Sequence, residues 1–118
     1  MEIRSEAADG VAVCRIIGRI DALTSRDLES AVNSATREET PRIIFDMREV
    51  DFISSAGLRV ILVAAKQVAA AEGGLSIFGV QPAVNEVFEI SGVRKIIPIA
   101  SDEAKARAKL AAREGQES

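Results

Sequence analysis

The stretch RIIFDMREVDFISSAGLRVIL, Arg42–Leu62, carries the strongest indications of the fold and of a functional site. It begins with the apolar run Ile43–Phe45, which is typical of a buried strand. An acidic turn is expected next, followed by the small residues Ser54–Gly57 and a long apolar helical pattern. Free backbone N–H groups and the positive helix end point outward at such a junction, which predicts a site of phosphate size. The residues alone leave open whether Ser54 and Ser55 only cap the helix or also carry the function.

The sequence on both sides of this stretch alternates between strand and helix patterns. The turn signal Asp9–Gly10 predicts a hairpin between two strands, at 3–8 and 11–18. Thr24, with Asp27 three residues later, has the spacing of a capping box, so we expect Thr24 to cap the first helix. Further strands are expected at 75–80 and 96–99, and further helices begin at Pro82 and Ser101.

The resulting order, β-β-α-β-α-β-α-β-α, predicts an α/β fold. We expect a mixed, mostly parallel sheet of about 4–5 strands packed against about four helices. A chain of 118 residues has room for one domain with a modest core. This domain is expected to span residues 1–113, and residues 114–118 are expected to form a frayed tail.

The composition argues against several classes of site. The chain has no His, which removes imidazole catalysis and the commonest metal ligand. With no Trp or Tyr, four Phe and a net charge of −3, it is poorly suited to bind nucleic acid. The single Cys14 cannot form an internal disulfide and is expected in the core of a protein from a reducing compartment. No signal peptide or apolar membrane-spanning stretch is evident, so a cytoplasmic protein without membrane insertion is expected.

Three carboxylates, Asp21, Asp46 and Asp51, are each predicted at or just beyond the end of a strand. Strand ends cluster at one edge of an α/β sheet, which is the usual place for a site. Carboxylates beside a serine can form a Mg²⁺ site, but the Lys-bearing Gly-rich loop of phosphoryl-transfer enzymes is missing, and solvated turn carboxylates are the alternative. A serine nucleophile has no His or Lys base here. We therefore expect no enzymatic activity, metal or cofactor.

The segment DMREVDFISSAGL, Asp46–Leu58, resembles the signature of the STAS domain, specifically of the anti-sigma factor antagonists. Gly18–Asp21 resembles the Gly-x-Leu-Asp turn of that family, and Pro82–Val84 and Ser91–Gly92 are similar to its third-helix segment. The resemblance covers most of the chain, from about Val11 to Ile99, in the family's order of elements. The resemblance is specific because these motifs occur together, whereas each short motif alone would be weak evidence for the family.

The resemblance implies a partner-switching protein. In its unphosphorylated form such an antagonist binds an anti-sigma factor that is also a serine kinase, and phosphorylation of a serine at the start of the second helix breaks the complex. A metal-dependent phosphatase of the PP2C type restores it. The acceptor lies two places before the glycine of the motif, which here is Ser55. Many family members have Asp directly before the acceptor, where this chain has Ser54, and Ser54 is therefore the second choice of acceptor.

The resemblance also implies which residues surround the phosphosite. Asp21 matches the family's acidic residue near the acceptor, and Asp46 is expected at the end of the neighbouring strand. A phosphate among these carboxylates and Asp51 is expected to repel a docked partner, with little refolding. The partner surface is expected to include Ser54, Ala56, Gly57 and Arg59, while Val60 and Val63 either extend this surface or belong to the core.

Two other functions are compatible with a STAS fold. One is a small subunit of an ABC lipid-transport complex that binds the ATPase of that complex and needs no phosphorylation. The other is nucleotide binding or hydrolysis, which no phosphate loop in this sequence supports. Gene neighbours separate switching, which needs a kinase and a phosphatase, from transport, which needs a permease and an ATPase.

Overall fold

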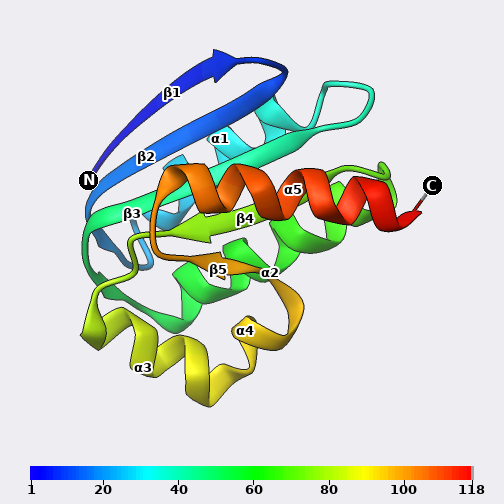
Figure 1. Cartoon of the computed structure of the whole chain (residues 1–118). Coiled ribbons are helices and arrows are strands. Elements are labelled where there is room, and N and C mark those ends of the chain that lie inside the picture. Colours follow the sequence, from blue (N-terminus) through cyan, green and yellow to red (C-terminus); the bar gives the residue numbers. More distant parts are fainter. Residues whose placement is uncertain (118) are drawn as a thin grey trace.

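The computed structural model describes the backbone of residues 1–117 and the side chains of residues 1–110. Five strands form one sheet in the order β1-β2-β3-β4-β5, in which only the β1–β2 pair is antiparallel (Figure 1). This confirms the mixed, mostly parallel sheet. The strands are β1 (Glu2–Ala8), β2 (Val11–Ile20), β3 (Arg42–Ile53), β4 (Gly74–Phe78) and β5 (Ile99–Ala100). The helices are α1 (Ser25–Ala35), α2 (Ser55–Ala70), α3 (Pro82–Ser91), α4 (Val93–Ile96) and α5 (Glu103–Glu117).

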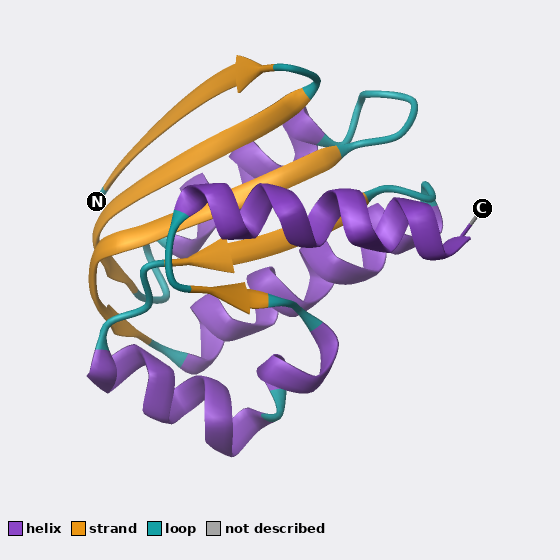
Figure 2. Cartoon of the chain, in the orientation of Figure 1, coloured by secondary structure: helices purple, strands orange, loops and turns teal. Residues whose placement is uncertain are grey.

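Helices cover both faces of the sheet, with α5 on one face and α1 and α2 on the other (Figure 2). Successive side chains of a strand point to opposite faces, and β3 supplies both layers. Phe45 and Met47 belong to the larger core, which includes Leu28 of α1 and Ile61 of α2. Ile44 belongs to a smaller core under α5. The apolar run at the start of β3 is therefore buried because helices cover the strand from both sides.

The hairpin and the core position of Cys14 are confirmed. Asp9 and Gly10 both have positive φ, 55° and 77°, as a tight two-residue hairpin turn requires. Cys14 lies in the larger core, and burial raises the pKa of its thiol. Its neighbour across the hairpin, Ser5, donates a hydrogen bond to the sulfur at 3.5 Å.

β3 is longer than expected, because the acidic run after Phe45 continues the strand and is not a turn. Its pairing with β2 extends to Ile53, which lies opposite Ile20. Val50 and Ile53 remain buried in the larger core and hold this second half in place. The prediction that Asp46 lies at the end of the strand is therefore wrong.

The last strand is also placed differently. Residues 93–96 form the short helix α4, and only Ile99–Ala100 pairs with β4.

The frayed tail predicted at 114–118 stays a prediction, since its side chains and Ser118 lie outside the described residues. Among the helices described, none has the length and apolarity that crossing a membrane requires.

Candidate functional site

The candidate site lies at the sheet edge where β2 and β3 end side by side. The backbone N–H of Ser54 donates a hydrogen bond to the carbonyl oxygen of Ile20 at 2.8 Å, so the ends of β2 and β3 stay paired until α2 begins. Ile20 is followed directly by the turn into α1, and Ser54 by α2. This arrangement brings the sequence around Asp21 and the Ser54–Ser55 pair to the same edge, as the sequence predicts.

Ser54 is the cap of α2. Its backbone is extended, with φ −91° and ψ 173°, and its Oγ accepts a hydrogen bond from the N–H of Gly57 at 3.3 Å. This geometry satisfies one of the N–H groups that a helix start leaves without a partner. The hydroxyl of Ser54 therefore has a structural role.

Ser55 is the first residue of α2, and its side chain is exposed. Within the described part of the chain, its hydroxyl takes part in no hydrogen bond. A negative group attached here would lie at the positive end of a helix of 16 residues. Of the two serines, Ser55 is therefore the one whose hydroxyl is available for chemistry.

Asp21 organises the turn between β2 and α1. Its Oδ1 accepts hydrogen bonds from the backbone N–H groups of Leu23 and Thr24, both at 3.0 Å. Thr24 in turn accepts the Asp21 N–H at 2.8 Å and donates to the Arg19 carbonyl at 2.7 Å. The bonds from Thr24, first that of its backbone N–H, hold the pKa of the Asp21 carboxyl below its ordinary value.

The expected capping box of Thr24 and Asp27 is wrong. Thr24 already has helical geometry, with φ −78° and ψ −20°, and its side chain makes no capping hydrogen bond. Its hydroxyl is instead engaged by Arg19 and Asp21. The turn that enters α1 is thus held mainly by Asp21, which directly follows Ile20, the residue whose carbonyl oxygen accepts the Ser54 N–H.

Replacing Asp21 with alanine is expected to lower the urea midpoint of unfolding at neutral pH, and this effect is expected to shrink as the pH falls below the ordinary Asp pKa of about 4. The folded-state pKa of Asp21 is lowered. Its stabilisation is therefore present above the unfolded-state pKa of about 4 and is lost as the pH falls through the folded value. Asp27→Ala, which removes another carboxylate from the same helix end, is the control. Equal losses in the two variants at neutral pH would contradict the role of Asp21.

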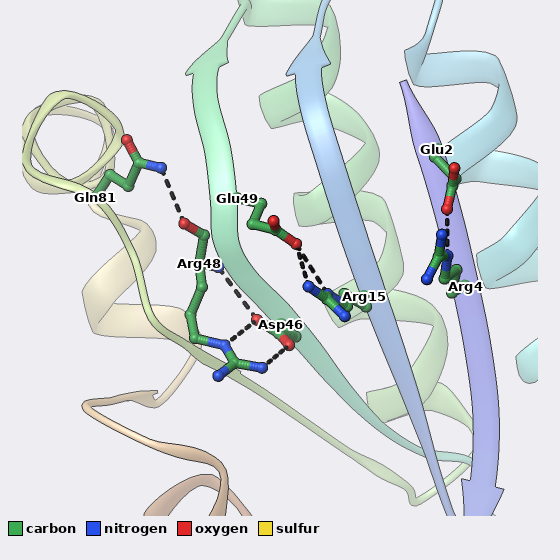
Figure 3. Close-up of polar contacts among 7 residues, drawn as sticks. All are labelled: Glu2, Arg4, Arg15, Asp46, Arg48, Glu49 and Gln81. Carbon is green, nitrogen blue, oxygen red and sulfur yellow. Dashed lines mark hydrogen bonds and ion pairs between the residues drawn. The ribbon is translucent and has the colours of Figure 1, made fainter.

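Asp46 does not belong to this site. It lies on the α5 face of β3, two residues after Ile44, while α2 packs on the opposite face. It is buried, and Arg48 binds both carboxylate oxygens, with Nε–Oδ1 and Nη2–Oδ2 distances of 3.0 and 2.8 Å (Figure 3). Burial of Asp46 by itself raises its pKa, but the hydrogen bonds and charge of Arg48 outweigh it and hold the pKa below the ordinary value. The prediction that Asp46 surrounds the phosphosite is therefore wrong.

The remaining predicted residues lie along the end of β3 and the first turns of α2. Asp51 and Arg59 are exposed, and Ala56 is half-buried. Gly57 is buried against β2 and β3, so it positions the helix and offers no side chain to a partner. Val60 is part of the core, whereas Val63 is 43% exposed on the solvent side of α2.

Sequence reasoning missed two exposed apolar side chains at the same end of the sheet, Leu23 and Phe52, which we call the apolar rim. Leu23 lies in the turn held by Asp21 and is 82% exposed, and Phe52 is 40% exposed near the end of β3. The Arg19 guanidinium carbon lies 4.2 Å from the centroid of the Phe52 ring, a cation–π contact. A large apolar side chain in a predicted turn, as at Leu23, was the signal available in the sequence.

A magnesium site formed by the three aspartates is not supported. Asp46 is on the other face of the sheet, and Asp21 uses its carboxylate in the turn. Over the part of the chain that the structure describes, no three acidic or cysteine side chains are grouped closely enough to hold a metal ion. The site therefore offers a hydroxyl, a fixed carboxylate and an apolar rim.

Comparisons with known proteins agree with this fold. Residues 2–106 match the family model of the STAS domain. Over 108 residues, the chain is 34% identical to BtrV of Bordetella bronchiseptica, named as a candidate anti-sigma factor antagonist, covering 92% of this chain and 93% of BtrV. The fold is similar to that of an anti-sigma factor antagonist from Mycobacterium paratuberculosis, with TM-score 0.83, 23% identity and 93% of each chain covered. It is also similar to Bacillus SpoIIAA in its phosphorylated form, with TM-score 0.70, 20% identity and coverage of 92% of this chain and 98% of that chain.

Proposed function

This chain belongs to the STAS domain family, and on that basis we propose that it is an anti-sigma factor antagonist switched by phosphorylation of Ser55. Unphosphorylated, it binds an anti-sigma factor that is also a serine kinase, and this releases the sigma factor. Phosphorylation of Ser55 by that kinase dissociates the complex. A phosphatase of the PP2C type removes the phosphate and restores binding.

The observation that carries this proposal is the division of roles between two adjacent serines. Ser54 caps α2 through its hydroxyl, whereas the hydroxyl of Ser55 is exposed at the first position of the same helix. An acceptor must reach the active site of a kinase without unfolding, and Ser55 meets this requirement. Modification of Ser54 would first have to break its hydrogen bond to Gly57.

The phosphoryl transfer requires the partner to supply the catalytic groups. The Ser55 Oγ forms a bond to the γ-phosphorus of ATP held by the kinase, the bond from that phosphorus to the bridging oxygen breaks, and ADP leaves. The hydroxyl proton passes to a base of the kinase, because Asp21 is occupied by backbone N–H groups of its own turn. The role of this chain is thus to present the hydroxyl at a rigid helix start.

The added phosphate acts through charge. It brings about −1.5 to −2 charges to the edge that already carries Asp21 and Asp51. A helix start favours an anion, so α2 is expected to keep its structure. In the complex with an anti-sigma factor docked against Ser55 and the apolar rim, the phosphate would lose its hydration and would face charge repulsion. Both effects lower the affinity, so the complex dissociates.

Incubation with the cognate kinase and ATP tests this proposal. Intact-mass spectrometry is expected to show one phosphoryl group on the wild type and on Ser54→Ala, and none on Ser55→Ala. Ser54→Ala is expected to lose about 1 kcal/mol of stability with its cap, whereas Ser55→Ala keeps both stability and partner binding. Phosphorylation that persists in Ser55→Ala would move the acceptor, and binding to a transporter ATPase without phosphorylation would favour the transport alternative.

A further inference from the structure

The outer edge of β1 is an interaction surface of its own. β1 pairs with β2 on one side only and forms the border of the sheet (Figure 1). All of its side chains except that of Ile3 are exposed. An edge strand of seven residues presents backbone N–H and C=O groups to whatever can pair with it. This edge lies two strands away from β3 and Ser55.

The two faces of β1 differ in character. Ile3, Ser5 and Ala7 lie opposite Ile16, Cys14 and Ala12 of β2, on the side of the sheet that α1 covers. Glu2, Arg4 and Glu6 point to the other side, and Arg4 is paired with Glu2 of its own strand (Figure 3). Such alternating charges normally keep edge strands from pairing with one another.

One register makes these charges complementary to a second copy of the same strand. In an antiparallel pair centred on Ser5, Arg4 of each copy lies opposite Glu6 of the other, and Glu2 lies opposite Ala8. Centring the pair on Arg4 instead would place Glu2 opposite Glu6 and Arg4 opposite Arg4. Centring it on Glu6 would place the two Glu6 side chains opposite each other. Opposite charges across a strand pair stabilise it and like charges destabilise it, so the register centred on Ser5 is favoured over these two. A pair centred on Ile3 would also place Glu2 opposite Arg4, but it would pair only residues 2–4 of β1, whereas the register centred on Ser5 pairs all seven residues of the strand.

The apolar side of β1 also suits this register. Ile3 of the second copy lies opposite Ala7, and Ala7 borders a hollow of about 420 Å³ between β1 and α1. Small side chains of α1 line it, namely Ala31, Ser34 and Ala35. Ile3 of each copy can therefore extend over the hollow of the other, and the small residues on α1 leave room for the approach.

We propose that this edge binds a second copy of the chain, forming a symmetric dimer through an antiparallel β1–β1 pair centred on Ser5. The sheet then continues from one copy into the other. Because Ser55 follows β3, each copy keeps its phosphorylation site open. The dimer does not depend on the proposed antagonist function.

Charge reversal at the two facing positions tests the dimer. Sedimentation velocity over a concentration series is expected to show dimers of the wild type. Arg4→Glu places Glu opposite Glu6 twice, and Glu6→Arg places Arg opposite Arg4 twice, so each variant is expected to dimerise at least about tenfold more weakly. A mixture of the two single variants is expected to form a heterodimer, because both of its contacts are complementary. The double variant Arg4→Glu/Glu6→Arg is expected to dimerise like the wild type.

Lys66→Glu, on the exposed side of α2, is the matched control, since it changes the net charge as much as Arg4→Glu and should leave the dimer intact. Circular dichroism checks that all variants are folded. A wild type that stays monomeric up to about 1 mM would overturn the proposal. So would dimers that persist in both single variants, because the contact would then lie elsewhere on the surface, or a mixture of variants that forms no heterodimer.

Discussion

Replacing Gly57 with valine is expected to lower the free energy of unfolding by about 3 kcal/mol and to impair phosphorylation of Ser55. A Cβ at this position would lie 2.4 Å from Cγ2 of Ile20, 3.0 Å from the Ile20 carbonyl oxygen and 3.1 Å from Cγ1 of Ile53. Side-chain rotation of Ile20 cannot relieve the contact with its own carbonyl oxygen. The first turn of α2 would therefore have to move away from the sheet and carry Ser54 and Ser55 with it.

The expected loss of stability in Gly57→Val is opposite in sign to the change that helix propensity alone predicts. Within an exposed helix, replacing Gly with Ala gains up to about 1 kcal/mol, and valine lies between the two. Urea unfolding measures this loss, and Ala70→Val is the control variant. Ala70 is exposed on the same helix, so Ala70→Val is expected to lower the free energy of unfolding by only a few tenths of a kcal/mol. A Gly57→Val protein as stable as the wild type would show that α2 can shift freely on β2.

The roles of the two serines could be predicted from the sequence to a large extent. A serine three residues before a glycine, at the junction of a strand and an apolar helix, is typical of a helix cap, and Ser54 is the cap. The next residue then begins the helix with its side chain free. Asp21 also lies where the pattern places it, because the parallel strands β2 and β3 end together.

The position of Asp46 could not be predicted, because a charged residue inside a strand looks like a turn residue in the sequence. Two residues of a strand spaced by two lie on the same face, so Asp46 and Arg48 neutralise each other within β3. The side-chain amide of Gln81 also contacts Arg48, because it donates a hydrogen bond to the backbone carbonyl oxygen of Arg48 at 2.9 Å (Figure 3). The ion pair depends on the face of the strand and on coverage by neighbouring elements, which a linear pattern does not contain.

Thr24 illustrates a competition between two local hydrogen-bonding patterns. The spacing of Thr24 and Asp27 fits a capping box, and Asp21 with Thr24 fits a turn in which the carboxylate accepts backbone N–H groups. The second pattern prevails because Thr24 can also donate to the Arg19 carbonyl at the end of β2. As a result, the Asp21 carboxylate is held in the turn at the same edge of the sheet as Ser55.

Ser55→Glu is expected to lower the affinity for the anti-sigma factor at least about 100-fold, which corresponds to about 2.7 kcal/mol, while the protein remains as stable as the wild type or becomes slightly more stable. The two effects have opposite signs because the new carboxylate faces different surroundings in each case. At the start of α2 it meets the positive helix end, which contributes about 0.3–1 kcal/mol. In the complex it is desolvated beside Asp21 and Asp51.

Ala70→Glu is the control for Ser55→Glu, because it shows whether the position of the added charge matters or only the change in net charge. It adds the same carboxylate to the exposed C-terminal end of α2, about 22 Å along the helix from Ser55. That distance exceeds the Debye length of about 8 Å at physiological salt, so binding should be unchanged, while the negative charge at the C-terminal helix end slightly lowers stability. Isothermal titration with the anti-sigma factor and urea unfolding measure both quantities. If Ser55→Glu lost affinity only in proportion to lost stability, a local unfolding of α2 would replace charge as the mechanism of the switch.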